Sequence, residues 1–310
     1  QTFKLDLEQV EAQVNKQLGQ QQQGTSSTSS FQSALGPPTV NVDFLLTNLI
    51  SNDQVKCLDA VNSLYLSVVT YESKQFDSRF CELLCSSVLL VKMIMNQSVF
   101  EHPSSLSIKI QLLRKVMEII LKMVKIDCSE EKYPDFRVAL YEVYSELTLR
   151  LVDGSLNSTD ENGFVKLFND TIVHLLEEAP KNATISILIQ ALRESCYNFS
   201  SSPSTEKLAD LLMRSLWKVT KSFPKFNPRE IRPQELLQEI AQFYSELPSA
   251  AWKERQSGNV PLGDLPHRTV KAILGELYKM FGENLFFFLK EPHYEYIRMT
   301  LVSIRERALS

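Results

Sequence analysis

Residues 80–94, FCELLCSSVLLVKMI, and residues 108–124, IKIQLLRKVMEIILKMV, decide the fold class of this chain. Apolar residues recur in both stretches at the three- and four-residue spacings of an α-helix, and they cover much of each helix's circumference. Helices of this kind are covered on more than one side, as they are inside a stack of helices. No stretch of the chain alternates convincingly with the two-residue period of a half-buried strand. The sequence therefore predicts an all-α protein.

The helical pattern continues almost without interruption from residue 41 to the end of the chain. Proline, serine and aspartate signals mark many of the expected helix ends. Twelve helices are expected, over residues 41–51, 53–70, 74–97, 104–126, 135–153, 161–178, 182–199, 204–222, 230–246, 265–281, 282–289 and 293–308. Taken in pairs, they give roughly 35 to 55 residues per pair, the length of HEAT-type repeats. A helical-repeat solenoid is therefore expected, with a globular helical bundle as the alternative.

The first 40 residues differ in composition from the rest. Residues 17–32, QLGQQQQGTSSTSSFQ, are too polar to offset their ordering entropy and predict a flexible linker. Before the linker, the spacing of apolar residues predicts a short helix with one apolar stripe. A helix this short is marginal alone in water, so we expect it either to dock onto a partner or onto the body of this chain, or to fray. The stripe consists of Leu7, Val10, Val14 and Leu18. We expect an acidic, amphipathic segment over 1–18, a linker over 19–40 and a helical-repeat domain over 41–310.

Composition and motifs argue against several classes of protein. The chain has 33 Lys and Arg against 37 Asp and Glu, and this net charge of −4 gives no support to nucleic-acid binding. Glycine is scarce, and no Gly-rich phosphate loop, nucleophile elbow or His-Glu-x-x-His motif occurs. No apolar run approaches the roughly 20 residues that cross a bilayer. We therefore expect no enzymatic activity, no cofactor, no nucleic-acid partner and no membrane partner.

The five cysteines and four histidines lack the spacing of a metal site. Residues 1–8 lack the basic and apolar regions of a secretory signal, so reduced thiols in the cytoplasm are expected. Cys81 and Cys85 are four residues apart and share a helical face, but no histidine is near them in sequence. Buried structural thiols are the expectation there. His174 lies in an apolar helical stretch and is expected to be packed or partly exposed.

Three aromatic stretches invite different interpretations. Trp217 lies inside an apolar helical stretch and is expected in the core. Residues 285–289, LFFFL, are also expected in the core, with an exposed binding patch as the alternative if the array ends there. Trp252, Lys253 and Arg255 are expected on a long loop that prolines bracket. An aromatic beside two cations on a loop fits a partner-binding feature, and equally a Trp that anchors the loop to its own domain.

Three further stretches, taken in order, resemble the TOG-domain microtubule polymerases of the ch-TOG and Minispindles branch, in the region that follows their fifth TOG domain. They are residues 3–11, FKLDLEQVE, residues 211–224, LLMRSLWKVTKSFP, and residues 265–279, LPHRTVKAILGELYK. The resemblance spans nearly the whole chain and consists of packing patterns in a common order. It implies a flat paddle of about six HEAT repeats, whose internal loops line one edge.

The resemblance also implies where tubulin would be gripped. In tubulin-binding members the first loop carries a Trp, followed three residues later by an Arg, and basic residues recur on later loops. Here Gln54 and Cys57 stand at those two positions. The stretches that match later loops, 98–103, 153–160 and 200–204, contain no Lys or Arg. Because the tubulin surface is acidic, such an edge lacks both the aromatic anchor and the complementary charge.

The resemblance therefore implies a non-catalytic interaction or scaffold domain of a microtubule polymerase, acting in spindle and centrosomal microtubule assembly without the usual tubulin grip. A microtubule-associated protein is the expected partner, for example a TACC-type adaptor. A monomer is expected, in the cytoplasm on the cytoskeleton, centrosome and spindle. The alternative is a TOG domain that binds tubulin or the microtubule lattice through unconventional contacts. The candidate loop contacts are Gln54, Lys56, Phe100, His102, Lys207, Trp252, Lys253 and Arg255.

Overall fold

The protein is helical throughout the part that this computed structural model describes. The described residues are 41–49, 51, 54–70, 78–96, 105–125, 132–153, 162–197, 203–257 and 262–309. They belong to one compact unit, Asn41–Ser310. Among them are twelve α-helices and four 3-10 helices, and no strand, so the all-α prediction is confirmed. The expected linker and the stripe of Leu7, Val10, Val14 and Leu18 lie outside the described residues and stay predictions.

Most helices lie where the apolar periodicity places them. The α-helices are α2 (Val42–Leu49), α3 (Gln54–Thr70), α4 (Phe80–Asn96), α5 (Ser105–Lys125), α6 (Phe136–Val152), α7 (Asn162–Glu178), α8 (Lys181–Tyr197), α9 (Pro203–Ser222), α10 (Pro233–Glu246), α11 (Ser249–Ser257), α12 (Leu265–Phe281) and α13 (Glu295–Leu309). The 3-10 helices are η5 (Phe223–Lys225), η6 (Pro228–Glu230), η7 (Gly282–Phe288) and η8 (Pro292–Tyr294).

Two expected elements are corrected. The predicted helix over 282–289 is the 3-10 helix η7, because Gly282 takes a positive φ of 57° and ends α12. The long loop expected around Trp252 contains α11 instead. Pro248 precedes this helix, and the stretch SAAWKER that follows is rich in good helix formers. The prolines and glycines on either side hid this short helix from the sequence reading.

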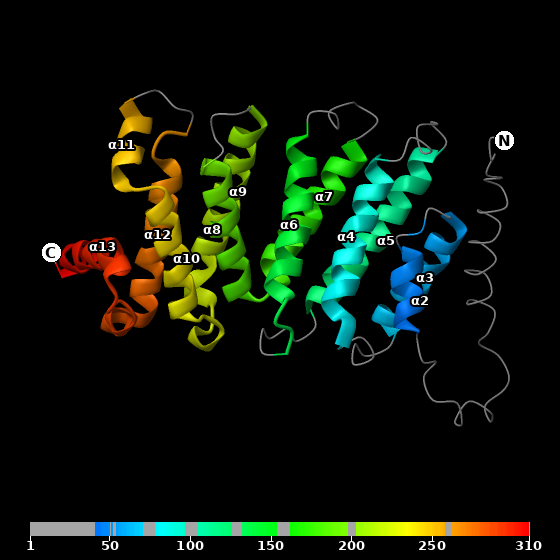
Figure 1. The fold of residues 1–310 in the computed structure, drawn as a ribbon, viewed down its shortest axis with the longest axis horizontal. Coiled ribbons are helices and arrows are strands. Elements are labelled where there is room, and N and C mark those ends of the chain that lie inside the picture. The colour runs from blue at the N-terminus through cyan, green and yellow to red at the C-terminus, as the bar shows by residue number, and fades with distance from the viewer. Residues whose placement is uncertain are drawn as a thin grey trace. The chain divides into compact units, whose positions relative to one another are not determined.

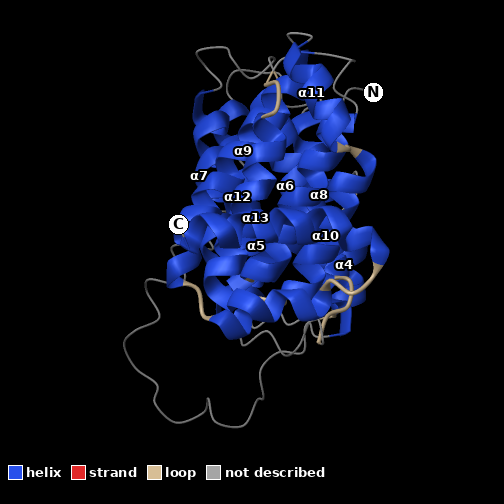
Figure 2. Ribbon diagram, turned by 90° about the vertical axis from the view of Figure 1, so that its left-hand side faces the viewer, coloured by secondary structure: helices blue, strands red, loops and turns tan. Residues whose placement is uncertain are grey.

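The helices form two layers, which Figure 2 shows side by side. In one layer α2, α4, α6, α8 and α10 pack against one another in that order. The other layer contains α3, α5, α7, α9 and α12, and the layers join where α2 packs on α3, α4 on α5, α6 on α7 and α8 on α9 (Figure 1). In the first layer each helix contacts the next but one in sequence, and in the second layer α3 contacts α5, α5 contacts α7 and α9 contacts α12. This is the stacking of a helical-repeat solenoid, which confirms the predicted architecture over a globular bundle.

The core lies between the layers. Every residue from Asn182 to Ile189 in α8 is buried, so this helix is covered on all sides. Each large apolar side chain that is fully buried contributes about 1.5–3 kcal/mol to stability. The largest of these side chains come from both layers: Phe80, Phe136, Phe164, Phe168, Phe223 and Phe243.

The C-terminal end of the array is closed by α13, which packs against α10 and α12. The stretch 285–289 lies at this end. Its two leucines, Leu285 and Leu289, are buried, as expected for core residues. Phe287 is 69% exposed and Phe288 is also exposed, so the core expectation is wrong for these two rings.

Candidate functional site

One edge of the array is where the resemblance places the tubulin-gripping loops. Along this edge α2, α4, α6 and α8 end and their partners α3, α5, α7 and α9 begin (Figure 1). Gln54 is the first residue of α3, and Lys56 is exposed in its first turn. Lys207 is exposed near the start of α9, and Lys253 is exposed on α11. Two further candidates, Phe100 and His102, lie outside the described residues and stay predictions.

Cys57 occupies the position where the resemblance expects an exposed Arg. Its side chain is buried, and the thiol donates to the carbonyl oxygen of Leu49 at 3.4 Å. Leu49 is the last residue of α2, so the thiol satisfies a carbonyl of that helix end. Burial raises the pKa of Cys57 to about 11. This position therefore stabilises the first helix pair and presents no cation to a partner.

Trp252 is a buried anchor for α11. Its side chain is only 3% exposed, and its ring stacks on Phe243 of α10 with centroids 5.8 Å apart and planes 10° from parallel. The indole N–H donates to the carbonyl oxygen of Leu247 at 2.8 Å. Of the two interpretations of Trp252, these contacts support the anchor to its own domain, because the ring holds α11 against α10.

Arg255 extends the same anchor to α8. Its Nη2 donates to the carbonyl oxygen of Cys196 at 2.6 Å, in the last turn of α8, where carbonyl groups lack helical partners. The guanidinium also lies over the Trp252 ring, 4.9 Å from its centroid. We call Trp252 and Arg255 the α11 clamp. Burial raises the pKa of Cys196 to about 12, and the nearby Arg255 opposes that rise.

An aromatic cluster continues from the α11 clamp to the C-terminal helix. Tyr244 of α10 and Tyr296 of α13 approach with ring centroids 4.7 Å apart. His267 of α12 lies 6.0 Å from the Trp252 ring, and its Nε2 is 2.7 Å from the Tyr296 hydroxyl. Burial lowers the pKa of His267, and the nearby Lys271 adds to the effect. The cluster joins four helices around an imidazole that is neutral at physiological pH.

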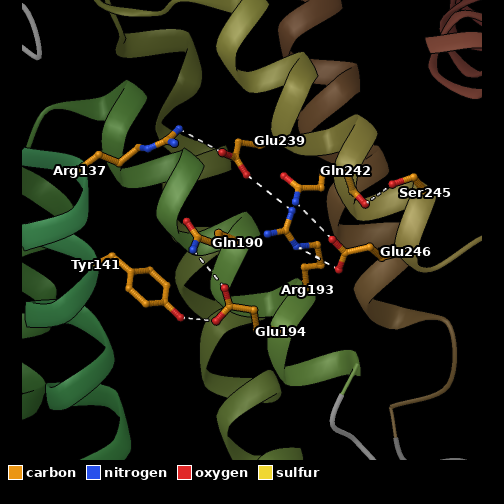
Figure 3. A network of polar contacts seen from close by, with 9 residues as sticks. All are labelled: Arg137, Tyr141, Gln190, Arg193, Glu194, Glu239, Gln242, Ser245 and Glu246. Carbon is orange, nitrogen blue, oxygen red and sulfur yellow. Dashed lines mark hydrogen bonds and ion pairs between the residues drawn. The ribbon is translucent and has the colours of Figure 1, made fainter. Parts of the chain in front are cut away.

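A charged network links α6, α8 and α10, which lie in one layer (Figure 3). Glu239 accepts from Nη1 of Arg137 at 3.0 Å and lies 4.0 Å from Nη1 of Arg193. The Nε of Arg193 is 3.4 Å from a carboxylate oxygen of Glu246. The side chains of Arg193 and Glu239 are only 8% and 10% exposed. Because buried charges are costly unless paired, removing one partner of this network leaves a buried charge uncompensated.

Groups with catalytic potential do not gather in the part that the structure describes. No three His, Cys, Asp or Glu residues among the described positions could hold a metal ion. His174 is exposed, and Cys81 and Cys85 are half-buried on α4. Desolvation raises the pKa of both thiols, that of Cys81 to about 11, which is the opposite of an activated cysteine. No described helix has the length and apolar character needed to span a bilayer.

The sequence reading missed one exposed aromatic, Trp217. It is 44% exposed on α9, so the core expectation is wrong. The signal was present in the sequence, because Ala209, Leu212 and Leu216 recur at spacings of three and four and define the buried side of α9. Trp217 comes directly after Leu216 and points about 100° away from it. It lies beside the cations of α9, which include the candidate Lys207.

Comparison with known proteins shows similarity to a protein that is microtubule-related by its name, mini spindles. Protein mini spindles of Drosophila melanogaster is 24% identical to this chain over 246 residues, which is 78% of this chain and 11% of that protein. The chain therefore spans about a tenth of the length of the relative it matches. No family model matches, and no solved structure matches. The similarity supports a relationship to a TOG-domain protein, in agreement with the order of sequence patterns and the helical-repeat fold.

Proposed function

We propose that residues 41–310 are a non-catalytic interaction domain of a microtubule polymerase. The domain corresponds to the TOG-like region after the fifth TOG domain and acts in spindle and centrosomal microtubule assembly. Similarity to Protein mini spindles and the helical-repeat fold support this proposal. The partner is a microtubule-associated protein, for which a TACC-type adaptor is one candidate. The domain positions the polymerase and does not add tubulin.

The observation that carries the proposal is the burial of Cys57 and Trp252 within their own domain. Cys57 stands where the family places an Arg, and its thiol bonds to the end of α2. Trp252, one of the candidate loop contacts, packs on Phe243. A side chain that is already packed in its own domain cannot serve as an anchor for a partner without unfolding that contact. Neither side chain is therefore available to grip tubulin.

Deletion of residues 41–310 from the full-length protein tests the proposal. We expect loss of spindle and centrosome localisation in cells, while the purified protein retains its polymerase activity in vitro. The control is the full-length protein with the single substitution Lys290→Glu, which keeps the α11 clamp and all helices. It should localise normally, because Lys290 is exposed on a connection between helices. Unchanged localisation after the deletion would contradict the proposal.

A second candidate function is tubulin binding through unconventional contacts at the same edge. The observation that favours it is Tyr197, an exposed aromatic at the last position of α8, where exposed Lys207 and Lys253 also lie. Co-elution of the 310-residue chain with αβ-tubulin on gel filtration, at low and moderate salt, separates the two candidates. A salt-sensitive complex that the triple variant Y197A, K207E, K253E abolishes would establish the second function. No complex would favour the first.

The N-terminal residues carry a separate proposal. We propose that residues 1–18 are a docking segment, separated from the helical domain by the linker 19–40. Hydrogen exchange tests it, because docking through Leu7, Val10, Val14 and Leu18 should slow exchange over residues 4–18. Fast exchange there, with and without a partner protein, would end the idea.

A further inference from the structure

One side of α9 carries a row of cations. Lys207, Arg214, Lys218 and Lys221 are separated by seven, four and three residues, so they lie on the same side of the helix. All four are exposed. With 1.5 Å of rise per residue, the row is about 21 Å long. The helix is held rigidly by α8 and α12, which pack on its buried sides. The row is therefore an ordered feature rather than a set of charges on a loop.

Trp217 lies within this row. It comes three residues after Arg214 and four before Lys221, so its half-exposed ring is flanked by cations along the helix. Trp and Arg are the residues that most often dominate binding at protein interfaces. Within the described residues, the Trp217 ring contacts no other aromatic ring and no cation lies over it. We call Lys207, Arg214, Trp217, Lys218 and Lys221 the α9 stripe.

The cations of the α9 stripe are available to a partner. Arg214 pairs with Asp210 at 2.6 Å and Lys218 pairs with Glu177 of α7 at 2.9 Å, and both pairs are largely exposed. Exposed pairs of this kind contribute little to stability, so an incoming carboxylate can replace either partner. Lys207 and Lys221 have no ion-pair partner among the described residues. The α9 stripe can therefore bind carboxylates without disturbing the fold.

The neighbouring helix extends the surface. α12 packs beside α9 in the same layer, and it carries Arg268, Lys271 and Lys279 on its outward side. Arg268 and Lys279 pair only with residues of their own segment, at 2.7 and 2.6 Å. Gly275 lies between these cations, and a Cβ there would meet no atom within 4 Å. The outward side of α12 is therefore open at Gly275, between Lys271 and Lys279 of the same helix.

We propose that the α9 stripe binds an acidic protein segment that carries one apolar side chain, with the carboxylates on the cations and the apolar group on Trp217. An extended segment advances about 3.3 Å per residue, so six or seven residues cover the row. We choose an acidic partner because its carboxylates complement the positive charges of the α9 stripe. The proposal deepens the proposed function by naming its class of partner, and it rests on that function.

Two other anionic partners fit the surface less well. Single-stranded nucleic acids are bound by several aromatic side chains that stack successive bases, whereas the α9 stripe has one. A membrane surface is bound by a helix with a broad apolar face, whereas the outward side of α9 offers Trp217 among four cations. An acidic peptide needs no more than the row of cations and one apolar anchor.

Fluorescence anisotropy with the whole 310-residue chain tests the proposal. The probe is a labelled 12-residue peptide of Asp and Glu with one central Leu, and the neutral probe has Asn and Gln in place of the acids. We expect binding of the acidic probe that weakens steeply with added salt, and no binding of the neutral one. Binding should also change the emission of Trp217, which the W217F variant identifies because Trp252 is buried.

Matched variants locate the site. The double variant Lys207→Glu, Lys221→Glu should weaken binding of the acidic probe at least tenfold, because it reverses two charges of the row. Trp217→Ala should weaken it about fivefold, because it removes the apolar anchor. All three residues are on the surface, so the fold should stay intact. The control makes the same charge change elsewhere, at exposed Arg229 and Lys290, and should weaken binding less than twofold. Circular dichroism melts verify folding of every variant.

Several results would overturn the proposal. Equal weakening by the control pair would show only general charge attraction, and tighter binding of oligonucleotides or anionic vesicles would assign the surface to another partner. Failure of the chain to bind the acidic probe would also refute the acidic-segment site. The proposed function would still be tested separately, by the localisation of the deletion variant. If the deletion variant keeps its localisation while the intact chain binds the acidic probe, the acidic-segment site stands and the proposed role in the polymerase is rejected.

Discussion

Because Trp252 belongs to the α11 clamp, the substitution Trp252→Ala should open α11 and expose the end of α8. The substitution removes the ring that stacks on Phe243 and the indole N–H that bonds to Leu247. It also removes the surface beneath the Arg255 guanidinium, which bonds to the carbonyl of Cys196. All the links that we identify between α11 and the array therefore weaken together.

The magnitude follows from these contacts. Truncating a buried Trp to Ala loses about 3–5 kcal/mol. The hydrogen bond and the ring pair account for about 1 kcal/mol each within that figure. Because each 1.4 kcal/mol is a factor of ten, the open fraction of α11 should rise at least a hundredfold. Most of the array should stay folded, since repeats depend mainly on their neighbours.

Thiol labelling at pH 8 provides the assay. In the native protein Cys196 is buried and its pKa is raised to about 12, so labelling by iodoacetamide should be slow. Opening of α11 should speed the labelling of Cys196 by about the same factor as the open fraction, as read by peptide mass spectrometry. Hydrogen exchange over residues 249–257 should accelerate in parallel.

The control variant is Lys253→Ala, which removes an exposed neighbour of Trp252 on the same helix. Its labelling rate and exchange should match those of the wild type. If Trp252→Ala behaves like this control, with Cys196 still protected, then α11 is held by something other than the α11 clamp and the reasoning is wrong.

Three further predictions concern the other interactions. Glu239→Ala leaves Arg193 buried with a single carboxylate, so urea unfolding should show that the free energy of unfolding falls by about 3 kcal/mol. Glu246→Ala, at the half-exposed end of the network, should lower it by less than about 1 kcal/mol. Burial lowers the pKa of His267 below its usual value near 6.5, so the unfolded chain takes up a proton first and stability falls as pH drops through about 6.5. The Tm gap between wild type and His267→Gln should therefore narrow between pH 8 and pH 5.5, and a constant gap would contradict this. Lys218→Ala should change Tm by less than about 2 °C, because its pair with Glu177 is exposed, and a larger shift would mean that the pair locks α7 to α9.

The sequence predicted the helices well because their signal is local. Apolar spacing within one stretch defines a helix and its buried side, and proline and glycine define its ends, so α2 to α10 lie close to the expected ranges. α11 was missed because a short helix carries little periodicity, and prolines and glycines surround it. The helix expected over 282–289 is instead a 3-10 helix, because one positive φ at Gly282 redirects the chain.

The sequence by itself determined that this chain is a stack of helices, and that nothing in it has the spacing of a known catalytic or metal motif. Only the tertiary structure decided that Trp252 is buried, whereas the apolar spacing of α9 already placed Trp217 off the buried side of its helix. Trp217 stands in an apolar run yet faces solvent, and Trp252 stands among charges yet packs on Phe243. The side that a residue presents depends on which neighbours its helix meets, and this is fixed by packing between distant segments. Helical spacing sets Lys207, Arg214, Lys218 and Lys221 in one row along α9, and packing leaves that row exposed. The net charge of −4 gave no sign of this row, because net charge says nothing about where charges lie.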